Sequence, residues 1–193
     1  YKHTTMGFLK DIQDMPNQYD YSRLFYRRFY RPEYVVIVVA GDVMKEKTRT
    51  LVEKYWGGWE RGDYRPEIPA EPPPSGARTN HINWATPTLP LVNVAFRTPA
   101  YTDTAVDSAA LDLIAYLGFS ESSELYQKLV IKEQKVDVLS ASNPDHVDPF
   151  LFRIQARLKE ASDIGDVRDQ ILSTLEAFRE QPVPASRLDA VKK

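Results

Sequence analysis

The sequence predicts an α+β fold in which helices cover one face of a mostly antiparallel sheet, and three observations lead to this class. Over residues 79–193, periodic segments follow in the order strand, strand, helix, helix, strand, strand, helix, helix. Apolar and polar residues alternate over 150–158, as in a strand with one buried face. Residues 62–77 hold five prolines, which indicates a semi-rigid linker between two structured stretches.

The stretch before this linker is predicted to contain three helices and one strand. Residues 4–15 form a short helix that ends at Pro16. Residues 20–30 form a stronger helix, because apolar side chains recur at i, i+3, i+4 and i+8 (Tyr21, Leu24, Phe25 and Phe29). The β-branched run at 34–40 predicts a strand buried on both faces. A third helix spans 45–56 and ends at two glycines.

The stretch after the linker is predicted to hold four strands and four helices. Strands are expected at 79–85, 91–97, 136–142 and 150–158. A strongly amphipathic helix is expected at 106–117, a shorter one at 122–133 and a long one at 164–178. A last helix follows Pro184 and includes 188–193, with no capping glycine. Because the chain also starts at Tyr1, we expect it to be cut from a longer polypeptide at both ends.

Charge and composition exclude several functions. The chain has 193 residues, with 25 Lys and Arg against 27 Asp and Glu, so its formal net charge is −2. A general nucleic-acid binder usually has a basic excess, so no nucleic-acid partner is expected. There is no cysteine, which excludes disulfides, thiolate metal sites and cysteine nucleophiles. No apolar run is long enough to predict a membrane span.

Residue patterns for catalysis are also missing. The three histidines, His3, His81 and His146, form neither H-E-x-x-H nor H-x-x-E-H. The Asp145 to Asp148 segment, which contains His146, could hold a divalent cation, but its turn-forming residues favour a strand-connecting loop. Tyrosines and arginines at 19–31 could bind single-stranded nucleic acid, but an amphipathic helix is favoured. The sequence therefore predicts no catalytic and no metal-ligating residue. A further hypothesis is that an exposed edge of the predicted sheet binds an extended peptide.

Several segments, in this order along nearly the whole chain, resemble the insulinase or pitrilysin-like (inverzincin) zinc metallopeptidase family. They are YKHTTMG at 1–7, FYRRFYRP at 25–32, VIVVAGD at 36–42, LVEKY at 51–55, SSELYQKL at 122–129 and KEQ at 132–134. The resemblance implies a half-lobe of the LuxS/processing-peptidase-like type, built from two similar α+β subdomains. Two such halves close around an unfolded peptide.

The resemblance also implies how this chain is divided. Residues 1–61 would be the end of the first, metal-site subdomain, 62–77 the linker, and 78–193 a second, non-catalytic subdomain truncated at its C-terminus. The zinc motif would lie upstream, so zinc is expected in the parent protein and no cofactor in this fragment. The expected partners are the missing upstream subdomain, a second half-lobe and an unfolded peptide substrate.

Two positions depart from a pattern, L-R-x-K-E-Q-x-x-Y, through which some family halves contact substrate. Leu129, Lys132, Glu133 and Gln134 match it, but Val130 stands at the arginine position and Asp137 at the tyrosine position. The valine side chain is apolar and the aspartate side chain is ionised, so neither can donate a hydrogen bond. The resemblance therefore implies that this half lacks that role, which fits both a metal-bearing half and a degenerate scaffold.

Two functions follow from this resemblance. The first is the substrate-enclosing part of a zinc endopeptidase, inactive when isolated. The alternative is a non-catalytic scaffold or assembly subunit like the core proteins of the respiratory bc complex. We also expect an uncovered sheet edge to cause self-association of the chain, and a location in the bacterial periplasm or cell envelope.

Overall fold

The computed structural model describes residues 6–192 of the chain, and it divides into two compact units, Tyr1–Pro73 and Pro74–Lys193. Each unit is described by itself. The division falls between Pro73 and Pro74, inside the proline-rich tract at 62–77. None of the described helices is both long and apolar enough to cross a membrane.

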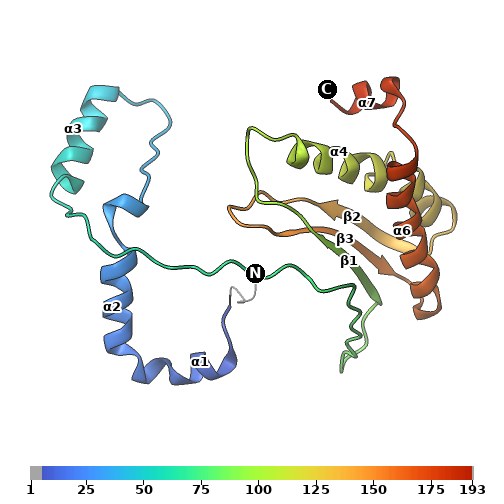
Figure 1. Cartoon of the computed structure of the whole chain (residues 1–193), viewed down its shortest axis with the longest axis horizontal. Helices are drawn as coiled ribbons and strands as arrows, with labels where there is room; N and C mark the ends of the chain where they lie inside the picture. The colour runs from blue at the N-terminus through green and yellow to red at the C-terminus, as the bar shows by residue number, and fades with distance from the viewer. Residues whose placement is uncertain (1–5, 193) are drawn as a thin grey trace. The chain divides into compact units, whose positions relative to one another are not determined.

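The first unit consists of short helices (Figure 1). They are α1 (Leu9–Asp14), η1 (Met15–Asn17), α2 (Tyr19–Phe29), η2 (Pro32–Tyr34) and α3 (Lys45–Trp56). The predicted helices at 20–30 and 45–56 are thus confirmed. The helix predicted at 4–15 is shorter, because Pro16 converts its end to the 3₁₀ turn η1; residues 4 and 5 lie outside the described part.

The buried strand predicted at 34–40 is wrong. Tyr34 ends the 3₁₀ turn η2, and residues 35–40 have no regular secondary structure and pair with no strand in the described chain. Their side chains are exposed; Val36 and Val38 are 86% and 82% accessible. A β-branched run favours extended backbone, but a strand forms only when a neighbour satisfies its N–H and C=O groups.

Residues 60–64 return to the end of α2. The guanidinium of Arg28 lies 4.7 Å from the centre of the Tyr64 ring, and the Phe29 ring meets that ring edge-on at 5.5 Å. The backbone N–H of Gly62 donates to Glu33 Oε1 at 2.9 Å. The stripe predicted for 20–30 is therefore only partly covered, at its Phe29 end, and none of the residues of α2 is fully buried.

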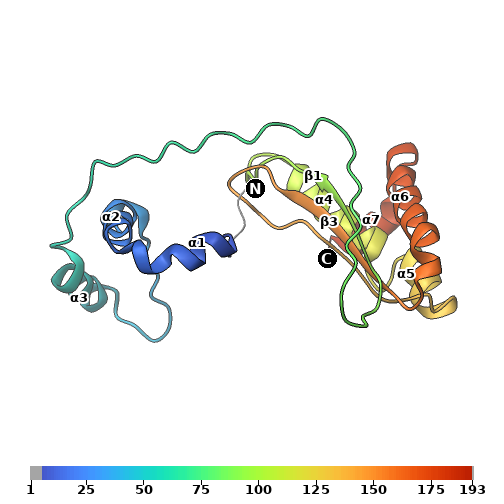
Figure 2. The same ribbon diagram turned by 90° about the horizontal axis from the view of Figure 1, so that it is seen from below.

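The second unit is a three-stranded antiparallel sheet with helices on one face (Figure 2). Its strands are β1 (Leu91–Arg97), β2 (Val136–Ser142) and β3 (Leu151–Leu158). Its helical elements are α4 (Asp107–Phe119), α5 (Glu124–Tyr126), η3 (Gln127–Lys132), η4 (Ala161–Asp163), α6 (Ile164–Glu180) and α7 (Ala185–Val191). The predicted strands at 91–97, 136–142 and 150–158 are confirmed, as are the helices at 106–117 and 164–178.

Two elements of this unit differ from the sequence predictions. Residues 79–85 are irregular and exposed rather than a strand, because no described strand pairs beyond β1. Residues 122–133 are not one α-helix. The three-residue α5 passes into η3, a π-helix, and Gln134 then has a φ of +53°. This left-handed residue turns the chain sharply toward β2.

The sheet order is β1-β3-β2, so β3 is central and β2 is an edge strand. Val94 lies opposite Ile154 on one side, and Ala141 lies opposite Ile154 on the other. Alternate residues of β3 (Phe152, Ile154, Ala156 and Leu158) face the helices and are fully buried with Phe119, Leu129, Val167 and Ile171. This core fixes α4 and η3 beside the edge strand.

Candidate functional site

A groove of about 600 Å³ runs beside the edge strand β2. Seven consecutive residues, 137–143, line it. Successive side chains of a strand point to opposite faces of the sheet. A hollow that touches every residue in turn must therefore follow the edge of the strand, where backbone N–H and C=O groups point away from β3.

The opposite wall of the groove comes from α4 and the turn that follows it. The lining residues there are Asp112, Ala115, Tyr116, Phe119, Ser120, Glu121 and Tyr126. The turn is held by Ser123, whose buried hydroxyl accepts a hydrogen bond from the backbone N–H of Tyr126 at 3.1 Å. The wall thus combines two tyrosine rings and two carboxylates on a well-packed support.

Asp137 stands at the start of the groove. The pairing of β2 with β3 shifts register between Val136 and Val138, so Asp137 occupies a bulge. Its carboxylate accepts hydrogen bonds from Arg157 Nε, at 2.9 Å to Oδ1 and 3.0 Å to Oδ2, and from Arg157 Nη2, at 2.7 Å to Oδ2. These hydrogen bonds lower the pKa of Asp137, which keeps the carboxylate ionised.

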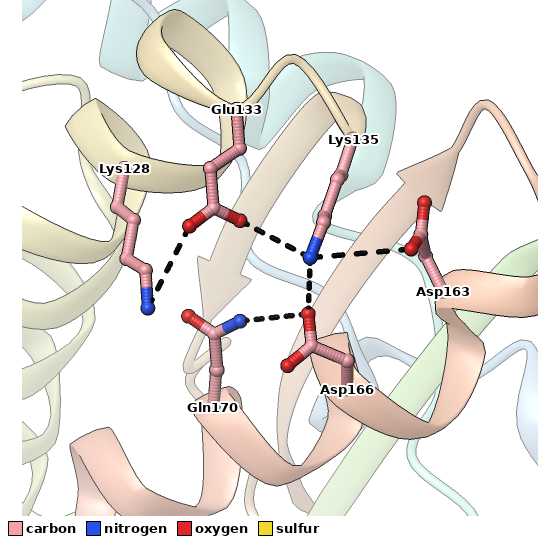
Figure 3. Close-up of polar contacts among 6 residues, drawn as sticks. All are labelled: Lys128, Glu133, Lys135, Asp163, Asp166 and Gln170. Atoms are coloured by element: carbon pink, nitrogen blue, oxygen red, sulfur yellow. Dashed lines mark hydrogen bonds and ion pairs between the residues drawn. The ribbon is translucent and has the colours of Figure 1, made fainter.

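A polar cluster holds the turn that leads into β2 (Figure 3). Lys135 Nζ lies 2.6 Å from Asp166 Oδ2, 3.3 Å from Glu133 Oε2 and 4.0 Å from Asp163 Oδ1. Gln170 also donates to Asp166 Oδ2, at 3.0 Å. The hydrogen bond to Asp166 raises the pKa of Lys135, so Lys135 stays charged at neutral pH, and its ion pairs tie the end of η3 to the start of α6.

The far end of the groove is fixed by hydrogen bonds between α4 and the β2–β3 loop. Asn143 Nδ2 donates to Asp112 Oδ1 at 3.3 Å and to Ser108 Oγ at 3.3 Å. Ser108 Oγ donates in turn to Asp145 Oδ1 at 3.1 Å. These bonds position the end of β2 against α4.

The positions that the sequence singles out lie in different surroundings in the structure. Val130 is half-buried and packs against the core, whereas Asp137 lines the groove. His146 lies in the β2–β3 loop with its ring 3.8 Å from that of Phe150. His81 is exposed and bonds Asn83 at 2.9 Å, and His3 is outside the described residues.

Within residues 6–192, no group of three or more His, Asp or Glu is placed to hold a metal ion. Two of the aromatic and basic residues of α2 contact neighbouring rings: Tyr26 stacks on Tyr30 at 4.8 Å, and Arg28 lies 4.7 Å from the centre of the Tyr64 ring.

The wall residues Asp112, Tyr116 and Glu121 belong to no local motif that predicts a site from the sequence. A usable signal exists in hindsight, because residues 98–127 contain five acidic residues and no lysine or arginine. Charge bias of this kind marks a one-sided electrostatic surface.

The fold is that of a protease half-lobe. A crystal structure of a protease from Helicobacter pylori matches it with a TM-score of 0.82 and 25% identity, over 96% of this chain and 45% of that one. The chain belongs to the family described as the peptidase M16 inactive domain, whose model matches residues 18–193. The resemblance to insulinase-like metallopeptidases is thereby confirmed.

One curated relative covers the whole chain. The zinc protease PqqE of H. pylori is 27% identical over 197 residues, which are 100% of this chain and 43% of that protein. The chain therefore spans less than half the length of the relatives it matches.

Proposed function

We propose that this chain is the non-catalytic, substrate-holding part of a zinc-dependent endopeptidase and that it binds an extended peptide along the edge of β2. The observation that carries the proposal is the groove beside β2, which is lined by every residue from 137 to 143. An exposed strand edge offers a row of unpaired backbone groups, and an extended peptide can satisfy them by joining the sheet.

The dimensions of the groove suit such a ligand. At about 3.4 Å per residue, a strand as long as β2 spans roughly 24 Å. A volume of about 600 Å³ lies within the usual range for ligand sites. The tyrosine rings on the opposite wall supply apolar contact area for side chains of the bound peptide.

In this proposal the hydrolytic chemistry belongs to other parts of the whole protein. The described residues do not fit a zinc site, since no suitable cluster occurs among them. The proposal includes zinc because the H. pylori relative is named a zinc protease. Zinc held elsewhere in the whole protein would supply Lewis-acid and water-activating chemistry, while the residues of this chain would bind and orient the peptide within an enclosed chamber.

The proposed partners follow from the same division of roles. An upstream subdomain and a second half-lobe would complete the chamber, which is consistent with relatives of more than twice this length. The finer division of this chain also stands as a proposal: 1–61 from a metal-site subdomain, 62–77 as linker and 78–193 as the non-catalytic subdomain.

Peptide binding to the 193-residue chain tests the proposal. Fluorescence anisotropy would compare a labelled extended decapeptide with the same sequence N-methylated at alternate residues. N-methylation removes backbone donors, so strand addition predicts at least tenfold weaker binding of the methylated peptide. Equal binding of the two peptides, or no binding of either, would refute substrate holding by β2 and favour the scaffold alternative.

A further inference from the structure

We infer that the groove beside β2 selects extended peptides that carry lysine or arginine at alternate positions. This inference rests on the proposed function, since it names the class of peptide that the same groove takes. It depends on the distribution of charge around the groove and on which carboxylates are already paired.

All charged side chains that line the groove are acidic. They are Asp112 on α4, Glu121 on the following turn and Asp137 on β2. The surrounding chain has the same bias: residues 98–127, which include α4 and its turn, hold five carboxylates and no cation. The loop after β2 adds Asp145 and Asp148 and no lysine or arginine.

The three lining carboxylates differ in what they already contact. Asp137 is neutralised by its paired bonds to Arg157. Asp112 receives only the neutral amide of Asn143, at 3.3 Å, which leaves its charge uncompensated. Glu121 is exposed, and its carboxylate makes no hydrogen bond or ion pair with any residue in 6–192. Two charges on one wall of the groove are therefore available to a ligand.

The geometry of strand addition explains why the basic residues of the peptide should stand at alternate positions. Alternate side chains of a peptide paired with β2 point to the helix-covered face of the sheet, where α4 supplies Asp112 and its following turn supplies Glu121. Long basic side chains lay their methylene stems on apolar surface. Tyr116 and Tyr126 offer such surface in the same wall, and their rings also attract cations.

Three peptides test the inference by fluorescence anisotropy with the 193-residue chain. They share length and apolar residues and carry Lys, Gln or Glu at the alternate positions. We expect the Lys peptide to bind about three- to tenfold more tightly than the Gln peptide, with the Glu peptide weakest. This advantage should shrink between 50 and 200 mM salt, since these charges are exposed.

Variants with equal charge changes identify the groove as the source. Asp112→Asn with Glu121→Gln should remove most of the advantage of the Lys peptide. Glu160→Gln with Glu180→Gln, outside the lining residues, changes the net charge equally and should leave the advantage intact. A Lys peptide that binds no better than the Gln peptide, or equal losses in both variants, overturns the inference while strand addition stands. If none of the three peptides binds, the proposed function itself fails.

Discussion

Replacing Leu129 by alanine should destabilise the second unit strongly, because this side chain is fully buried in the core that also contains the groove residues Phe119 and Leu139. Leu129 is fully buried in η3 and belongs to the core formed with Phe119, Leu139 and Ile154. The substitution removes three carbon atoms, which at about 0.8 kcal/mol each amount to about 2.4 kcal/mol of transfer free energy. The cavity left behind raises the expected loss to about 3–4 kcal/mol.

Urea unfolding followed by circular dichroism measures this loss. With a slope of about 2 kcal/mol per M, the midpoint should fall by roughly 1.5–2 M. Ile131→Ala is the matched control, because Ile131 lies on the same turn but is 53% exposed; its cost should be less than about 1 kcal/mol. Similar losses in the two variants would refute the packing described for η3.

Three further predictions follow from other parts of the chain. Isothermal titration of the chain with zinc should show no tight site, and the chain should cleave no unfolded peptide in a chelator-sensitive way; such cleavage would contradict the assigned role. The hydrogen bond from Lys135, with a second from Gln170, lowers the pKa of Asp166 below its ordinary 3.8, so this contribution to folding is present above about pH 3.8 and is lost as the pH falls through the lower native value. Asp166→Asn should therefore weaken the fall of the urea midpoint below pH 4, whereas an unchanged pH profile would count against this pairing. Sedimentation should show concentration-dependent association driven by the exposed run 35–39, with Val38→Lys reducing it; a wild-type chain that is monomeric at all concentrations would contradict this expectation.

Elements with strong local periodicity could be predicted from the sequence. The helix predicted at 45–56 is α3 (Lys45–Trp56), and the strand predicted at 136–142 is β2 (Val136–Ser142). In both, the apolar spacing and the flanking turn residues agree with the final structure. The alternation along β3 also gave the buried face correctly, because that strand is paired on both sides and covered by helices on one face only.

Elements that depend on a distant neighbour could not be predicted in this way. The run at 34–40 has the composition of a buried strand, but its own residues do not determine whether another strand pairs with it. The π-helix η3 contains the buried Leu129 and is followed by the left-handed Gln134. Helical spacing does not distinguish this from an α-helix.

The candidate site could be predicted from the sequence only in part, for the same reason. A comparison with a family pattern drew attention to Asp137, but its place in the groove depends on a bulge in β2 and on Arg157 of the neighbouring strand. Asp112 and Glu121 lie on another element, and they meet the β2 edge only because α4 packs beside that strand. Proximity of this kind arises from tertiary structure.

Amide hydrogen exchange tests strand addition at β2 most directly. The exchange of each backbone amide in β2 and in the opposite edge strand β1 (Leu91–Arg97) would be measured with and without a saturating lysine-bearing peptide. The account predicts slower exchange at alternate residues of β2 and no change in β1. Protection confined to β1, or no protection in either strand at saturating peptide, would contradict it.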